Sequence, residues 1–167
     1  MLLERGLLVL TGGPGTGKTS TVTRALTLLA AALQHDDAQA GPVRIALTAP
    51  TGKAAARLAQ AVAGAKASLA NTALPPALEA GLAAIPDEAV TLHRLLGYQP
   101  YGNRFSRGRD APLAADVVLV DEASMVDLRL MAQLFGALAP EARVILLGDK
   151  DQLASVETGQ VLGDLTA

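Results

Sequence analysis

The sequence predicts an α/β fold in which a parallel β-sheet is covered by helices on both faces. Short continuous apolar runs alternate with longer segments whose apolar residues recur at helical spacing. Continuous apolar strands are typical of parallel sheets that are buried on both sides. The chain has 167 residues, half of them hydrophobic. This length is enough to bury one core and favours a single domain.

The expected elements follow one another in a regular order. Four strands are expected, at Leu7–Leu10, Val43–Leu47, Asp116–Val120 and Val144–Leu147. Three helices alternate with them, at Lys18–Leu33, Gly52–Ala65 and Val126–Leu138. Thr51 is a natural N-cap for the second helix, and Ser124 and Asp127 are expected to form a capping box before the third. Residues 67–115 interrupt the alternation, and we expect an insertion there with a short helix from Thr91 and a small hairpin.

Composition limits the possible partners and surroundings of the chain. The formal net charge is −2, so any binding to nucleic acid would come from local groups rather than from an overall basic excess. The absence of cysteine removes disulfides and thiolate metal sites and favours the cytoplasm. No apolar stretch is long enough to cross a membrane, and Glu4 breaks the N-terminal run that resembles a signal peptide.

A glycine-rich segment, "GGPGTGKT", follows the first expected strand and opens the first expected helix. It fits the phosphate-binding pattern G-x-x-x-x-G-K-[ST] in the strand–loop–helix setting that confirms such a motif. Backbone N–H groups of such a loop surround phosphate oxygens, and the helix N-terminus attracts their charge. Lys18 would reach the β- and γ-phosphates of ATP, and the Thr19 hydroxyl would bind Mg²⁺. The expected nucleotide-binding residues are Gly13, Pro14, Gly15, Thr16, Gly17, Lys18, Thr19 and Ser20.

Two further strands end in polar residues that complement this loop. The run "VVLVDE" delivers Asp121 to the Mg²⁺ shell and places Glu122 to orient or deprotonate an attacking water. The last strand leads into "GDKDQ", where Gln152 is expected to contact the γ-phosphate or its attacking water. Asp149 is expected to fix that loop or to reach the Mg²⁺-bound water. Because ligands of parallel sheets gather at the carboxyl ends of the strands, these groups are expected to converge on one edge.

Five motifs together resemble a known family. The segments "GGPGTGKT", "TAPTGKAAARL", "TLHRLLG", "VVLVDEASMVDL" and "LLGDKDQLASVETGQVLGDL" occur in this order in superfamily 1 helicases of the RecD type. This is the family of the α subunit of exodeoxyribonuclease V, the RecBCD helicase–nuclease. The resemblance covers nearly the whole chain and implies the first RecA-like P-loop motor domain of a 5′-to-3′ DNA helicase that acts in double-strand break repair and recombination.

The resemblance also implies a path for single-stranded DNA. Thr51, Gly52 and Lys53 match the motif that touches the strand backbone, and a helix N-terminus with a hydroxyl and a cation suits phosphate. Thr91 and His93 match a Thr-x-His segment near the DNA, although His93 could equally be a packed or capping residue. The arginines at 104, 107 and 109 are read as a solvated surface loop rather than a DNA-facing one.

The family implies partners and parts that the 167 residues do not supply. Its members assemble with a helicase–nuclease subunit and a recognition subunit, of the RecB and RecC type. The second RecA-like domain with its arginine fingers is missing from the sequence, and such fingers contribute ~10³–10⁵ in rate in related NTPases. The chain, as a piece of a larger helicase, is therefore expected to bind ATP–Mg²⁺, to hydrolyse it slowly and not to unwind DNA.

Three alternatives remain open from the sequence. A stand-alone RecD-like helicase would carry the same motifs. A P-loop kinase would transfer phosphate to a small molecule, although Glu122 and Gln152 suit water better as the acceptor. A nucleotide-gated module could serve assembly alone, in which case Glu122→Gln would leave the activity of the assembled complex intact.

Overall fold

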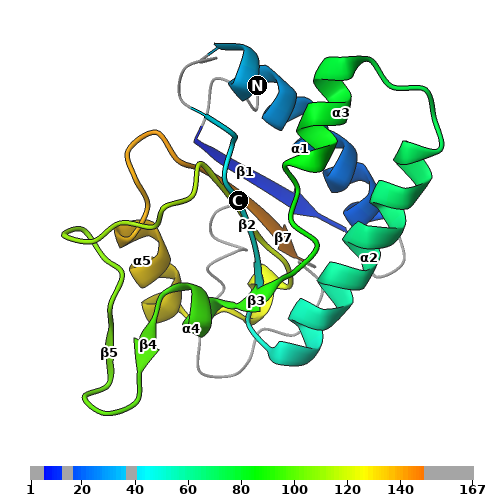
Figure 1. Ribbon diagram of the computed structural model, residues 1–167. Helices are drawn as coiled ribbons and strands as arrows, with labels where there is room; N and C mark the ends of the chain where they lie inside the picture. The colour runs from blue at the N-terminus through cyan, green and yellow to red at the C-terminus, as the bar shows by residue number, and fades with distance from the viewer. Residues whose placement is uncertain (1–5, 13–16, 37–40, 149–167) are drawn as a thin grey trace.

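The computed structural model describes residues 6–12, 17–36 and 41–148 (Figure 1). The elements along the chain are β1 (Leu7–Thr11), α1 (Lys18–Asp36), β2 (Ile45–Ala49), α2 (Gly52–Ala70), α3 (Pro76–Ala83), β3 (Val90–Thr91), α4 (Leu92–Leu95), β4 (Tyr98–Gln99), β5 (Arg104–Phe105), β6 (Val117–Val120), the 3₁₀ turn η1 (Ala123–Met125), α5 (Leu128–Gly136) and β7 (Arg143–Gly148).

Five strands form one parallel sheet, in the order β1-β7-β6-β2-β3. β6 and β7 lie in the interior of the sheet, and nearly all of their residues are buried. The predicted α/β class, with a parallel sheet and helices on both faces, is confirmed. β3 is a fifth strand that the sequence pattern did not predict. It lies within residues 67–115 and pairs with the end of β2. The hydroxyl of the buried Thr48 in β2 donates a 2.9 Å hydrogen bond to the carbonyl of Val90 in β3.

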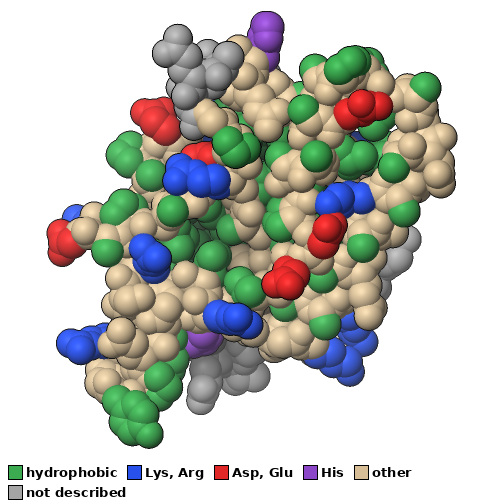
Figure 2. Space-filling model, in the orientation of Figure 1, with side chains coloured by type: hydrophobic (Ala, Val, Ile, Leu, Met, Phe, Trp, Pro, Cys, Tyr) green, Lys and Arg blue, Asp and Glu red, His purple; other side chains and the backbone are tan. Residues whose placement is uncertain are grey.

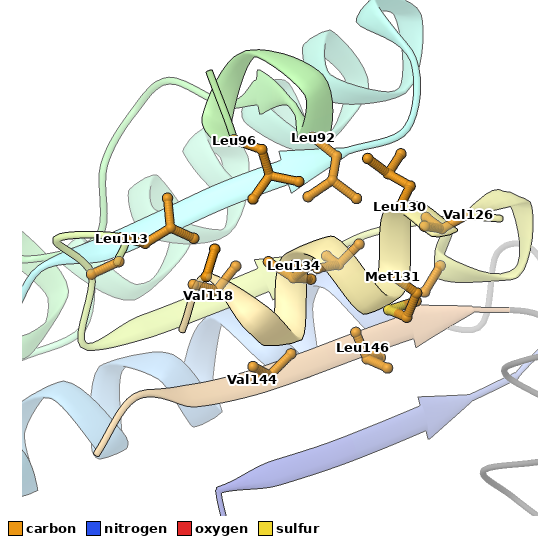
Figure 3. Packing of buried hydrophobic residues seen from close by; sticks show 14 residues of the cluster. Leu92, Leu96, Leu113, Val118, Val126, Leu130, Met131, Leu134, Val144 and Leu146 are labelled. Atoms are coloured by element: carbon orange, nitrogen blue, oxygen red, sulfur yellow. The ribbon is translucent and has the colours of Figure 1, made fainter. Parts of the chain in front are cut away.

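The two faces of the sheet carry separate hydrophobic clusters. α1, α2 and α3 cover one face, where Leu26 and Leu58 pack with Leu119 of β6 and Ile145 of β7. α4 and α5 cover the other, and Figure 3 shows Leu130, Met131 and Leu134 of α5 packed over β6 and β7. Leu92 of α4 and Leu96, the residue after α4, lie beside them. Successive residues of β6 alternate between the clusters, as the pleat of a strand requires. Aliphatic side chains therefore fill both layers.

α3 packs closely on the phosphate-loop helix α1 through a glycine. A Cβ atom at Gly81 would lie 2.4 Å from the carbonyl oxygen of Thr27 and 2.9 Å from the amide nitrogen of Ala31. The absence of a side chain therefore allows the two helices to approach each other. Thr27 itself is buried, and its hydroxyl donates to the carbonyl of Thr23 within the same helix.

A hairpin of β4 and β5 stands away from the sheet at the lower left of Figure 1. It begins at Gly97, which has φ +66 and whose Cβ, if present, would clash with the Ser106 hydroxyl at 2.0 Å. The backbone amide of Ser106 donates to the Gly97 carbonyl at 3.1 Å, which closes the base of the hairpin. Glycine is required here both by the left-handed conformation and by the close approach.

The surface shows no single field of charge on the face in view. Lys and Arg side chains are spread singly over it rather than gathered in a stripe, and the hairpin ends in hydrophobic side chains (Figure 2). Within the described ranges, no helix combines the length and the apolar character that crossing a membrane requires.

Candidate functional site

The strands of the parallel sheet end together and bring the predicted polar residues to one edge. Thr11 at the end of β1 pairs with Gly148 at the end of β7, and Val120 at the end of β6 pairs with Leu146. β7 lies between β1 and β6, so the two outer strand ends are separated by two strand spacings, roughly 10 Å. This separation suits a ligand that reaches from the glycine-rich loop to the acidic pair.

The described ends of the phosphate loop are fixed on both sides. The amide of Gly12 donates to the carbonyl of Gly148 at 3.3 Å, which ties the start of the loop to the end of β7. Gly17 has φ +74, and an added Cβ would meet nothing within 4 Å, so the backbone conformation rather than lack of space requires glycine there. The Gly17 carbonyl accepts from the Thr21 amide at 3.0 Å and opens α1.

The phosphate-binding residues are described only in part. Thr19 is half-buried in the first turn of α1, and its carbonyl accepts a 2.8 Å hydrogen bond from the Thr23 hydroxyl. Ser20 is exposed beside it. Gly13, Pro14, Gly15 and Thr16, the side chain of Lys18, and Asp149 and Gln152 lie outside the described part of the chain. Their predicted roles therefore stay predictions.

The acidic pair follows β6 in an unusual backbone conformation. The amide of Asp121 donates to the Thr48 carbonyl at 2.9 Å and extends the β6–β2 ladder by one residue. Glu122 then adopts φ 50 and ψ 41, the left-handed region, and its amide donates to Oδ1 of Asp121 at 2.9 Å. Non-glycine residues in this region carry strain that is typical of functional sites. The turn thus fixes one carboxylate and redirects the chain at the sheet edge.

The turn that follows corrects one expectation from the sequence. Asp127 caps α5, because its Oδ1 accepts from the Leu130 amide at 2.7 Å. The predicted capping box is wrong for Ser124, which lies in the 3₁₀ turn η1 and does not cap the helix. Its Oγ is buried and has no hydrogen-bond partner among the residues that the structure describes. A tighter turn intervenes before the helix, and the predicted start at Val126 moves to Leu128.

The residues present fit a Mg²⁺–nucleotide. Mg²⁺ is commonly held by one or two protein oxygens together with substrate phosphates and water. Thr19 and Asp121 carry oxygen ligands of this kind, and the buried Ser124 hydroxyl, in the turn that follows Asp121 and Glu122, has no partner among the described residues. Among the described residues no group of three or more His, Asp or Glu side chains is placed to hold a metal ion by itself.

The predicted strand-backbone motif opens α2. Thr51 is the N-cap, as predicted, with φ −122 and ψ 155, and its hydroxyl oxygen accepts from the Ala54 amide at 3.2 Å. Gly52 and Lys53 are exposed in the first turn of the helix. The arrangement presents a helix N-terminus, a hydroxyl and the exposed side chain of Lys53 at the carboxyl end of β2, a combination that suits a phosphate.

The second predicted DNA segment lies just before the hairpin of β4 and β5 in the chain. Thr91 caps α4 by accepting from the Arg94 amide at 3.3 Å. The exposed ring of His93 lies 5.3 Å from the ring of Tyr98, edge to face, and 6.0 Å from the ring of Phe105. His93 is therefore packed on one side and open on the other.

Sequence reasoning missed the aromatic partners of His93, although a signal was present. The chain has only two Tyr and two Phe, and three of these four lie within residues 98–105. Tyr98 and Phe105 pack with ring centroids 5.2 Å apart, while Tyr101 at the hairpin tip is 98% exposed. The arginines at 104, 107 and 109 are exposed, as expected for a solvated loop.

Comparison with known proteins identifies the family of the chain. The model of the AAA domain family matches residues 1–158. The chain is 55% identical over 164 residues to the RecBCD enzyme subunit RecD of Mycobacterium tuberculosis (strain ATCC 25618 / H37Rv), covering 98% of this chain and 27% of that protein. It is 46% identical to the RecBCD enzyme subunit RecD of Haemophilus influenzae, covering 94% of this chain and 23% of that protein.

A helicase of another name is also similar. The ATP-dependent RecD2 DNA helicase of Deinococcus radiodurans is 43% identical over 153 residues, which is 92% of this chain and 17% of that protein. The chain thus spans about a quarter or less of the length of these curated relatives. The resemblance to RecD-type helicases that the five motifs indicated is confirmed by these matches, and the chain belongs to the AAA domain family.

Proposed function

We propose that residues 1–167 form one RecA-like ATPase domain, the motor domain of a RecD-type DNA helicase that acts in double-strand break repair and recombination. One observation carries the proposal: the ends of β1, β7 and β6 lie side by side, so the start of the phosphate loop and the acidic pair share one edge of the sheet. The similarity to RecD subunits of RecBCD enzymes and to a RecD2 DNA helicase supports the same assignment.

In this proposal, residues at different strand ends have different roles in ATP hydrolysis. The phosphate loop, with Lys18, holds the phosphates, and Thr19 and Asp121 hold the metal ion. Bound Mg²⁺ would neutralise charge on the phosphate oxygens. Glu122 orients the attacking water and accepts its proton, and Gln152 contacts the γ-phosphate or this water. The left-handed turn at Glu122 supports this role, because it directs the residue after β6 away from the strand axis at the edge where the phosphates would lie.

Single-stranded DNA is the proposed track of the motor. Thr51, Gly52 and Lys53 would hold the strand backbone at the N-terminus of α2, and Thr91 and His93 would lie along the same path. β2 and β3 are neighbours in the sheet and both end at the edge that carries the acidic pair, which supports a common surface for the two segments. The proposed setting is a cytoplasmic heterotrimer with a helicase–nuclease subunit and a recognition subunit.

The isolated 167-residue chain provides the first test. We expect it to bind ATP or ADP in the presence of Mg²⁺, measured by titration with a fluorescent nucleotide, and to release phosphate very slowly with or without DNA. Replacing Mg²⁺ with EDTA should weaken binding. Fast DNA-stimulated phosphate release, or transfer of phosphate to a small-molecule acceptor, would contradict the proposal.

A further inference from the structure

The hydroxyl of Ser124 is a buried polar group without a hydrogen-bond partner in the described part of the chain. Its Oγ is shielded from solvent and makes no hydrogen bond among the described residues. Most buried side-chain hydroxyls in proteins are paired, and each exception calls for a structural or functional reason. The helix-capping role that the sequence suggests belongs to Asp127 instead. No hydrogen bond within the described residues therefore explains a serine at this position.

The location of Ser124 connects it to the proposed water-activating residue. The Met125 amide donates to the Glu122 carbonyl at 3.0 Å, so the turn that encloses Ser124 begins at Glu122. Ala123 and Val126, on either side of it, are buried in the core and anchor the turn. The turn η1 packs beside β7, the strand that separates the phosphate-loop strand from the acidic strand. Ser124 thus lies within the turn that begins at Glu122.

The backbone conformation of Glu122 also has to be stabilised by its neighbours. Its left-handed backbone conformation is unfavourable for a residue with a side chain, and the surrounding structure must maintain it. The hydrogen bond from its amide to Asp121 fixes the front of the turn. The back of the turn, at Ser124, has no such polar contact among the described residues.

We propose that Ser124 is a positioning residue whose hydroxyl gains a hydrogen-bond partner when a Mg²⁺–nucleotide is bound, and that this bond fixes the turn carrying Glu122. The proposal rests on the proposed function, because it requires a nucleotide at this edge of the sheet. Its physical basis is that a buried unpaired donor makes a bound state with a matching acceptor more favourable by one hydrogen bond.

The test compares the free and the nucleotide-bound chain. Ser124→Ala removes no hydrogen bond that the described residues make, so the melting temperature of the free variant should equal or exceed that of the wild type. Affinity for Mg²⁺–ADP or a non-hydrolysable Mg²⁺–ATP analogue should fall about fivefold, the effect of one net hydrogen bond. Ser124→Cys keeps the volume but is a poor hydrogen-bonding group, and it should behave like Ser124→Ala. Ser68→Ala, at an exposed position of α2, should change neither quantity.

Three other outcomes of these measurements would contradict the proposal. A lower melting temperature of free Ser124→Ala together with unchanged nucleotide affinity would show a purely structural serine and would overturn the inference. Wild-type affinity in Ser124→Cys but not in Ser124→Ala would assign the effect to volume and would overturn it too. If the wild type itself showed no Mg²⁺-dependent nucleotide binding, the proposed function would fail together with the inference.

Discussion

The amide of Glu122 donates a 2.9 Å hydrogen bond to Oδ1 of the preceding Asp121, and Glu122 itself adopts the left-handed region, at φ 50. Two adjacent acidic residues would point to opposite sides of a continuing strand. Here the strand ends after Val120, and the turn gives Asp121 and Glu122 different surroundings. Asp121 is fixed to the backbone, and Glu122 begins the 3₁₀ turn.

The strain at this turn predicts an order of stability among substitutions. Glu122→Gly should be more stable than Glu122→Ala by about 1 kcal/mol, because glycine adopts the left-handed conformation without a Cβ penalty. Urea unfolding of the two variants measures the difference. Equal stabilities, or a more stable alanine variant, would show that the turn relaxes out of this conformation.

Removing the carboxylate of Glu122 should separate binding from hydrolysis. In the full-length helicase, Glu122→Gln is expected to retain Mg²⁺–nucleotide affinity but to lower DNA-stimulated phosphate release by at least ~10²-fold, the usual contribution of a general base. In the active helicase the nucleotide should remain trapped and translocation should stop. Glu141→Gln, at an exposed position before β7, is the matched control and should retain full activity. Full activity of Glu122→Gln would instead favour a module that serves assembly alone.

Close packing between α3 and α1 predicts opposite effects for two glycine substitutions. Gly81→Ala would place a Cβ 2.4 Å from the Thr27 carbonyl oxygen and should destabilise the fold by about 1–3 kcal/mol. Gly64→Ala lies in α2 with nothing within 4 Å of the added Cβ, and it should stabilise the fold by about 0.4–1 kcal/mol. Urea unfolding tests both, and the prediction fails if Gly81→Ala is as stable as the wild type.

An ion pair at the opposite edge of the sheet predicts a pH dependence. The guanidinium of Arg44 donates to both carboxylate oxygens of Asp116, at 2.7 and 3.2 Å, and its hydrogen bonds lower the pKa of Asp116 from its ordinary value. The stabilisation from a lowered carboxyl pKa is present above the unfolded-state value and is lost as the pH falls through the folded-state pKa.

The variant Asp116→Asn tests this contribution. Unfolding measured from pH 7 down to pH 3 should show the wild type slightly more stable near neutrality, with the difference shrinking as the acid is protonated. The expected effect is small because both side chains are partly exposed, at 60% for Arg44 and 37% for Asp116. Nucleotide affinity should not change, since the pair precedes β2 and β6 and the site follows them. A difference independent of pH would rule out the ion pair as its cause.

The proposed DNA contact of Lys53 predicts a change in salt dependence. Lys53→Ala should weaken single-stranded DNA binding for all sequences alike and reduce the slope of log affinity against log salt by about 1, the signature of one lost phosphate contact. Arg24→Ala, at an exposed position on α1, should leave the slope unchanged. An unchanged slope for Lys53→Ala would place this lysine outside the DNA path.

Local patterns in the sequence were sufficient to predict most of the architecture. The apolar runs identified four strands within one or two residues of their observed bounds, because a strand buried on both faces must be apolar throughout. The Thr51 cap was predictable because its hydroxyl satisfies a backbone amide three residues away. The convergence of the strand ends also followed, since parallel strands share their carboxyl edge.

Contacts between distant residues determined the remaining features. The two-residue strand β3 is too short to show a period, and it forms only because β2 offers a free edge, with Thr48 bonding to Val90. The glycine at 81 has no local signal, because its need arises from α1, some fifty residues earlier in the chain. Ser124 shows a local capping pattern that the tight turn after Glu122 overrides. The sequence alone thus predicted which functional residues stand at each strand end. Packing in three dimensions determined the strand order, the left-handed turn and the unpaired hydroxyl, because these depend on neighbours that no local pattern encodes.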